Sequence, residues 1–330
     1  MWLKATIDRV RTRISSYLAR RPHRSFRLTR KRDIPKKVVM PGYFAFTKEV
    51  ITTLWRYKTT FGAFLVVYVL LATMIIGIAQ QDQYTSFVAA LRSFGPDLLG
   101  GDLGKVTEVT TLFGAAITGG FSTPLDRAGQ LNTLLLTLFS WLTIVWLLRQ
   151  LLAGNKVKLR DGLYNSGAPF VSTLIILSVA LLQLLPAIAA VIIFSTASST
   201  GVLEGGVEAM AFGIGALLLI VLSMYWVTST FFAGIIVTLP GTYPMRALRS
   251  ASDIAFGRRT ALVKRYLWLG LVTAVLWAVV LLPILALDGT FNISWLPLVP
   301  ITLQILGAFS LLLASAYTYL LYRKLIDGDA

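Results

Sequence analysis

The chain has 330 residues, of which 56% are hydrophobic and 14% are charged, and its formal net charge is +16. This composition, with a mean hydropathy of +0.72, lies outside the range of soluble globular proteins and indicates an integral membrane protein. The chain contains no Cys and one His, which excludes disulfide frameworks, iron–sulfur clusters, cysteine zinc sites and a Ser-His-Asp triad within the membrane.

Residues 1–37 are predicted to form a basic cytoplasmic arm. Residues 1–60 hold 16 Lys or Arg against three acidic residues. Leu3, Ile7, Val10 and Ile14 recur at helical spacing among basic residues. This pattern predicts an amphipathic helix, lying either in a head-group layer or against the protein itself. The most basic stretch is a candidate site for anionic lipid or another phosphate, and its members are Arg20, Arg21, Arg24, Arg27, Arg30, Lys31 and Arg32.

Residues 38–60 are predicted to form an elbow helix that leads into the first membrane span. The chain turns at Pro41 and Gly42, after which Phe46, Val50, Leu54 and Trp55 are predicted to fall on one helical face.

Six uncharged runs follow, each long enough to cross about 30 Å of hydrocarbon as a helix. They cover residues 61–79, 131–148, 168–194, 210–239, 266–287 and 296–322. A backbone in lipid must satisfy its own hydrogen bonds, and these runs are longer and less alternating than the strands of a barrel. The predicted fold class is therefore an all-α polytopic membrane protein, with six transmembrane helices in a bundle over residues 61–322.

The distribution of Lys and Arg predicts that both termini are cytoplasmic, including the tail at 323–330. The loops near 149–161 and 240–265 are basic, whereas the alternate segments at 80–130, 195–209 and 288–295 are acidic or neutral. Segment 80–130 is therefore predicted to lie outside. Its apolar part, residues 106–121, has too short an uncharged run to cross and is interpreted as re-entrant or interfacial.

Similar features precede and end several spans, which suggests a three-fold repeat of helical pairs. Basic amphipathic segments precede the first, third and fifth runs, and runs three and five each contain Leu-Leu-Pro, with Pro186 and Pro283. The alternative is that helices entering from inside commonly begin with basic residues and that the shared tripeptide is chance. Both prolines are candidate helix kinks, although proline is also common in plain spans.

The six runs contain no Asp, Glu, Lys, Arg or His, which argues against proton-coupled transport and metal-dependent membrane proteolysis. No metal or cofactor is expected, and the chain is not expected to be an enzyme. Uncharged polar residues form a candidate intramembrane cluster of Gln183, Ser223, Tyr225, Thr228 and Ser229. Hydrogen bonding between helices is the favoured interpretation, and a polar groove for a lipid head group or small substrate is the alternative.

The segments LRDGLYNSGAPF and MRALRSASDIAFGRR, followed by spans that contain Leu-Leu-Pro, carry a family resemblance. They resemble a mostly uncharacterised group of six-span bacterial membrane proteins related to the membrane domain of glycerophosphoryl diester phosphodiesterases. The resemblance covers roughly residues 155–290 and implies a multi-pass protein of the bacterial cytoplasmic membrane. The phosphodiesterase catalytic barrel has no counterpart here, so hydrolase activity is not implied.

Two functions follow as hypotheses. The first is a non-catalytic scaffold or accessory subunit whose arm binds anionic lipid or a cytoplasmic partner, with ribosome or RNA contact among the options. Membership of a membrane protein complex is a further option for the whole protein. The second is an uncoupled permease or lipid-handling protein in which Pro186, Pro283 and residues 223–230 line a path.

Overall fold

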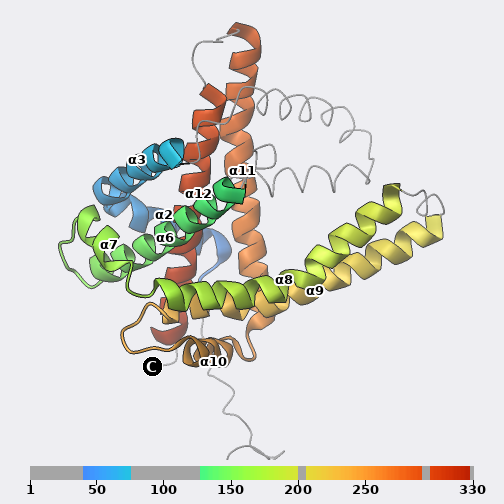
Figure 1. Ribbon diagram of the computed structural model, residues 1–330, viewed down its shortest axis with the longest axis horizontal. Coiled ribbons are helices and arrows are strands. Elements are labelled where there is room, and N and C mark those ends of the chain that lie inside the picture. Colours follow the sequence, from blue (N-terminus) through green and yellow to red (C-terminus); the bar gives the residue numbers. More distant parts are fainter. Residues whose placement is uncertain (1–39, 76–126, 200–205, 292–297, 328–330) are drawn as a thin grey trace, which may run out of the picture. The chain divides into compact units, whose positions relative to one another are not determined.

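The computed structural model describes residues 40–75, 127–199, 206–291 and 298–327, and these residues form helices joined by turns (Figure 1). The chain divides into two compact units, Met1–Val38 and Val39–Ala330, and every described residue belongs to the second. The predicted arm and most of the predicted outside segment lie outside the described residues.

The described helices include short and long elements. In chain order they are α2 (Tyr43–Arg56), α3 (Lys58–Ile75), α6 (Arg127–Leu152), α7 (Leu159–Asn165), α8 (Phe170–Ser199), α9 (Gly206–Ile236), α10 (Pro244–Ala255), α11 (Arg259–Phe291) and α12 (Leu298–Asp327).

Five helices in the described part of the chain are long and apolar enough to cross a membrane, and the bent pair α2–α3 raises this number to six if it counts as one span. The candidate spans are Leu131–Leu152, Phe170–Phe194, Val207–Ile236, Arg259–Leu281 and Ile301–Ile326. The predicted all-helical class is therefore confirmed for the described residues, and the candidate spans are compatible with a multi-pass membrane protein.

Several predicted boundaries differ from the observed ones. The candidate span that contains the fifth predicted run begins at Arg259 instead of residue 266, and α12 continues to Asp327 through most of the predicted tail. The elbow predicted over residues 38–60 ends at Arg56, and α3 begins at Lys58. Hydropathy marks where charges begin, whereas helical hydrogen bonding continues through Lys and Arg, because their long side chains can carry the charge away from the apolar surface.

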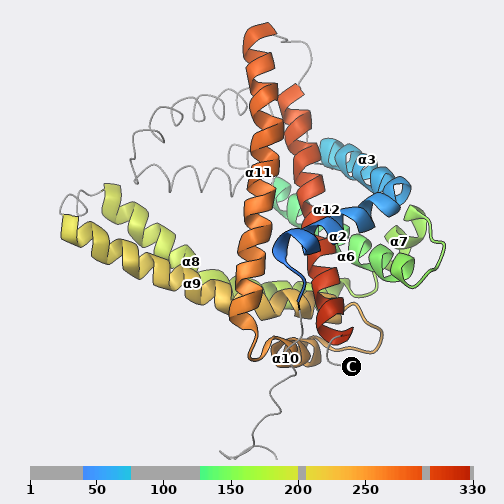
Figure 2. The same cartoon turned by 180° about the vertical axis from the view of Figure 1, so that it is seen from behind.

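α12 is the central helix of the described unit, and it packs against α2, α3, α6, α9 and α11. Of its span, 72% is buried within the protein, compared with 6% of the α9 span. α8 and α9 form a long antiparallel pair and lie side by side in both views (Figures 1 and 2). Most of the apolar surface of this pair therefore faces outward, as expected of helices that contact lipid.

The local sequence explains how two of the short helices, α7 and α10, begin. α10 starts with Pro244 at a position where a missing N–H costs nothing, and its buried stripe of Ala247, Ala251 and Ala255 allows close packing on α9. α7 is capped by Asp161, whose carboxylate accepts a hydrogen bond from the Lys158 backbone N–H at 3.0 Å.

Candidate functional site

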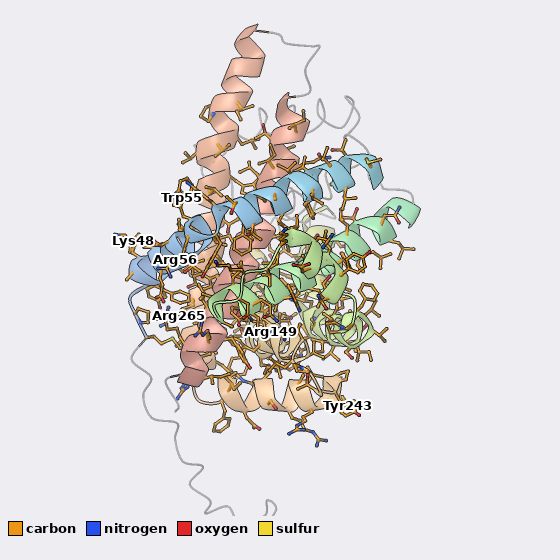
Figure 3. The ribbon with its side chains drawn as sticks, turned by 90° about the vertical axis from the view of Figure 1, so that its left-hand side faces the viewer. Lys48, Trp55, Arg56, Arg149, Tyr243 and Arg265 are labelled. Atoms are coloured by element: carbon orange, nitrogen blue, oxygen red, sulfur yellow. The ribbon has the colours of Figure 1, made fainter. Side chains whose placement is uncertain are left out.

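α2 buries one face and exposes another. Phe46, Val50 and Leu54 are buried in the core of the unit. On the other side, Phe44 is 77% exposed and Trp55 is 71% exposed. The prediction that Trp55 shares the buried face is therefore wrong, because at about 100° per residue it lies beside Phe44 and Ile51. We call this second surface the outer face of α2, and its members are Phe44, Lys48, Ile51, Thr52, Trp55 and Arg56. Figure 3 shows Lys48, Trp55 and Arg56 along α2.

A sharp bend separates α2 from α3. The two helices meet at 84°, with Tyr57 between them. The hydroxyl of Tyr57 donates to the carbonyl oxygen of Leu151 at 3.0 Å, near the end of α6. This bond ties the corner to another helix and satisfies one of the carbonyls left open at a helix terminus.

Arg265 is the most buried charged side chain that the structure describes, at 6% exposure. Its Nη2 donates to the Pro41 carbonyl oxygen at 2.6 Å. Its guanidinium carbon also lies 5.3 Å from the ring centroid of Tyr43 and 5.4 Å from that of Phe46. Cation–π contacts of this kind are strongest when water is excluded, so Arg265 holds the start of α2 against α11.

Two further contacts fix α2 in place. The indole N–H of Trp268 donates to the Thr47 hydroxyl at 3.0 Å. The Lys324 ammonium lies 2.9 Å from the Glu49 carboxylate. The Lys324–Glu49 pair is half-exposed and adds little energy by itself, but it ties α2 to the end of α12.

The sequence pattern does not predict the buried position of Arg265. Arg265 ends the basic loop predicted at 240–265, and the fifth predicted run begins at residue 266. A signal was present, because Leu262, Leu269 and Thr273 share its helical face and are buried with it.

The predicted polar cluster is divided between several roles. Gln183 accepts a hydrogen bond from Thr230 at 2.6 Å, and Ser223 accepts one from the Ala187 N–H at 3.0 Å. These two bonds join α8 to α9. Thr228 and Ser229 instead donate to carbonyl oxygens of their own helix.

Tyr225 does not join this cluster. It is 40% exposed, and the Arg259 guanidinium carbon lies 5.0 Å from its ring centroid. The structure therefore brings Gln183 and Ser223 into the α8–α9 contact and leaves Tyr225 on another surface.

α8 and α11 each continue as one helix through their proline. Pro186 has no N–H, and its ring interferes with the helical bonding around it. The Ser223 hydroxyl accepts a hydrogen bond from the backbone N–H of Ala187, the residue directly after this proline. Pro283 lies in α11 with its side chain exposed.

Other helix pairs are joined by comparable bonds. Trp277 donates to Ser310 at 2.8 Å between α11 and α12, and Thr73 lies 2.9 Å from Gln304 between α3 and α12. Some polar groups of the long helices thus join neighbouring helices, whereas others, such as Thr228 and Ser229, bond within their own helix.

The seven candidate phosphate-binding residues of the arm all lie between Arg20 and Arg32. They are outside the described residues. Over the ranges that are described, no group of three or more His, Cys, Asp or Glu is placed to hold a metal ion. Comparison of the chain with protein-family models, with curated proteins and with solved structures gave no match.

Proposed function

We propose that the protein is a non-catalytic scaffold or accessory subunit of the bacterial cytoplasmic membrane, and that its basic arm binds anionic lipid or a cytoplasmic partner. The supporting observation is the use of polar groups in the spans. A polar permeation path would need side chains such as Gln183 and Ser223 to be free. Gln183 instead accepts a hydrogen bond from Thr230, and Ser223 accepts one from the Ala187 N–H. Their hydrogen bonds stabilise helix packing by roughly 0.6–2 kcal/mol each.

We propose six spans with both termini in the cytoplasm. Contacts among helix ends support this topology. Arg149, which Figure 3 labels, lies near the end of α6. It donates to the Thr238 carbonyl oxygen just after α9 at 2.8 Å. Lys324, near the end of α12, contacts Glu49 of α2. Ends that the positive-inside rule assigns to the cytoplasm are thus in contact with one another.

The same topology includes three units, each made of a short elbow helix and a long helical pair. α2, α7 and α10 each precede a long helix that leads away and a second that returns. This order fits the three-fold repeat and the resemblance to the membrane domain associated with the phosphodiesterases, both of which we retain as proposals.

Removal of the arm tests the proposed function against the permease alternative. We would compare the full chain, a chain lacking residues 1–37, and a full-length variant with the seven candidate arm residues replaced by Gln. The proposal expects both variants to lose copurifying phosphatidylglycerol or a cytoplasmic partner, and nuclease treatment identifies an RNA-dependent partner. Unchanged copurification in both variants, together with solute or lipid flux in proteoliposomes, would support the alternative.

A further inference from the structure

We propose that the outer face of α2, together with Lys58, binds the anionic head groups of membrane lipids. This surface is separate from the basic arm and consists of structured residues. The inference rests on the proposed membrane embedding of the chain, and it adds a defined lipid contact to the proposed function.

The residues of α2 fall into three sectors around the helix. At about 100° per residue, Phe44, Ile51 and Trp55 lie within about 40° of one another. They lie beside the buried face that contains Val50, and Lys48 and Arg56 lie farther around. The order around the helix is therefore protein core, exposed apolar side chains and then cations. A helix in the boundary between hydrocarbon and water needs this order.

Neither water nor hydrocarbon alone suits this surface. In water, the adjacent exposed side chains of Phe44, Ile51 and Trp55 would form an unfavourable apolar patch. In hydrocarbon, Lys48 and Arg56 would be costly to bury. The head-group layer accommodates both kinds of residue, because aromatic rings and the long stems of Lys and Arg are stable there.

The charge of the surface favours an anionic occupant. Glu49 is the acidic residue of α2, and its carboxylate pairs with Lys324 of α12 at 2.9 Å. Around the helix Glu49 lies about 20° from Arg56, but its charge is offset by Lys324, so Lys48, Arg56 and Lys58 leave this surface with a net positive charge. Lys58 sits 5.6 Å from the Trp55 ring centroid, which keeps a cation beside the aromatic side chain. Lipid phosphates complement this arrangement.

The surface is held in place before any ligand arrives. Arg265 donates to the Pro41 carbonyl oxygen. Trp268, about one turn farther along α11, donates to the Thr47 hydroxyl. The corner at Tyr57 is fixed to α6 through the Leu151 carbonyl oxygen. A surface that needs little ordering on binding loses less entropy when a lipid binds to it.

Fluorescent labels on single cysteines test where α2 lies. The full chain contains no Cys, so Ile51→Cys and Thr52→Cys can be labelled separately and reconstituted in vesicles of phosphatidylcholine and phosphatidylglycerol. The proposal expects the label at 51 to be quenched by lipids with a nitroxide high on the acyl chain and protected from aqueous iodide. The label at 52 should be open to iodide. Equal iodide quenching at both positions, or protection of position 51 from both quenchers, would overturn the proposal.

A second measurement tests the preference for anionic lipid. Thr52 lies between Lys48 and Arg56 around the helix, so its label reports lipids near both cations. Nitroxide-bearing phosphatidylglycerol should quench it more than nitroxide-bearing phosphatidylcholine. The triple variant K48Q/R56Q/K58Q should reduce this enrichment, by up to about fivefold per charge removed at low salt.

A matched variant separates a local site from a general charge effect. K156Q/R246Q/R249Q removes the same number of positive charges from exposed positions outside α2. It should leave the enrichment near Thr52 unchanged, and an equal loss in both triple variants would overturn the proposal. The same label in a chain lacking residues 1–37 should retain its enrichment. A negative result for lipid binding by the arm would therefore leave the α2 proposal intact. Loss of the enrichment near Thr52 in the chain lacking residues 1–37 would overturn the α2 proposal.

Discussion

Arg265 shows how one side chain can set the position of an element. Its guanidinium is buried at 6% exposure and reaches α2 through one carbonyl oxygen and two aromatic rings. A planar guanidinium stacks on rings and is more weakly hydrated than an ammonium, which makes it easier to bury. Arg265 therefore stabilises α2 where a Lys would not.

Replacing Arg265 with Gln should lower the free energy of unfolding by about 2–4 kcal/mol, because a charge-assisted hydrogen bond and two desolvated cation–π contacts are lost. R265K should also destabilise the protein, since it keeps the charge but loses the stacking. Thermal unfolding in detergent measures both effects. K264Q, at the exposed neighbouring position, is the control, and a midpoint for R265Q equal to that of K264Q would contradict the prediction.

Ser223 and Pro186 should be energetically coupled. Ser223 accepts the Ala187 N–H at 3.0 Å, directly after the proline that disrupts the helical bonding of α8. S223A should therefore cost about 1 kcal/mol in the parent protein, because it removes an acceptor from a partly buried N–H. In a P186A background the regular helical acceptor is restored. There, S223A should cost almost nothing.

Unfolding of the four proteins of this double-mutant cycle in detergent measures the coupling. S178A serves as a control, because the Ser178 hydroxyl bonds within its own helix and is exposed. Equal costs of S223A in both backgrounds would show that the hydroxyl does not compensate for the proline.

At the scale of elements, the close contact between α6 and α7 depends on Gly162. A Cβ built on Gly162 would lie 2.9 Å from Cγ and Cδ2 of the buried Leu147. G162A should therefore destabilise the protein by about 1–3 kcal/mol through overpacking. G167A is the matched control, since a Cβ there meets nothing within 4 Å. Unfolding measurements on the two variants should differ, and similar losses would contradict the prediction.

The same elements show what the sequence could predict. Uncharged runs located the long helices because a membrane span requires a continuous apolar stretch. The polar residues of α8 and α9 were expected to bond between helices, and Gln183 and Ser223 do so. Thr228 and Ser229 bond to their own backbone, and composition alone does not distinguish these choices.

Features made by distant partners could not be predicted. The corner at Tyr57 depends on a carbonyl 94 residues away, and the burial of Arg265 depends on a carbonyl 224 residues away. Local hydropathy contains no information on either partner. A prediction based on hydropathy therefore places Arg265 at the end of a loop and extends the elbow helix to residue 60, past the bend at Tyr57.

At the scale of the molecule, basic residues occur at the helix ends that contact one another. Arg149 near the end of α6 reaches the end of α9, and Lys324 near the end of α12 reaches α2. Moving a Lys or Arg across the hydrocarbon core is costly, so the topology we propose places the ends rich in these residues on the cytoplasmic side. The two helices of each pair then cross in opposite directions.

This topology predicts the side from which single cysteines can be labelled. K156C precedes α8, E208C lies in the first turn of α9 and D253C lies in α10, all at exposed positions. In intact bacterial cells, a membrane-impermeant maleimide should modify E208C and should modify K156C and D253C only after the membrane is opened. The parent chain has no Cys and gives the background. Modification of all three positions in intact cells, or of E208C only after opening, would contradict the proposed topology, because α8 and α9 must each carry the chain across once.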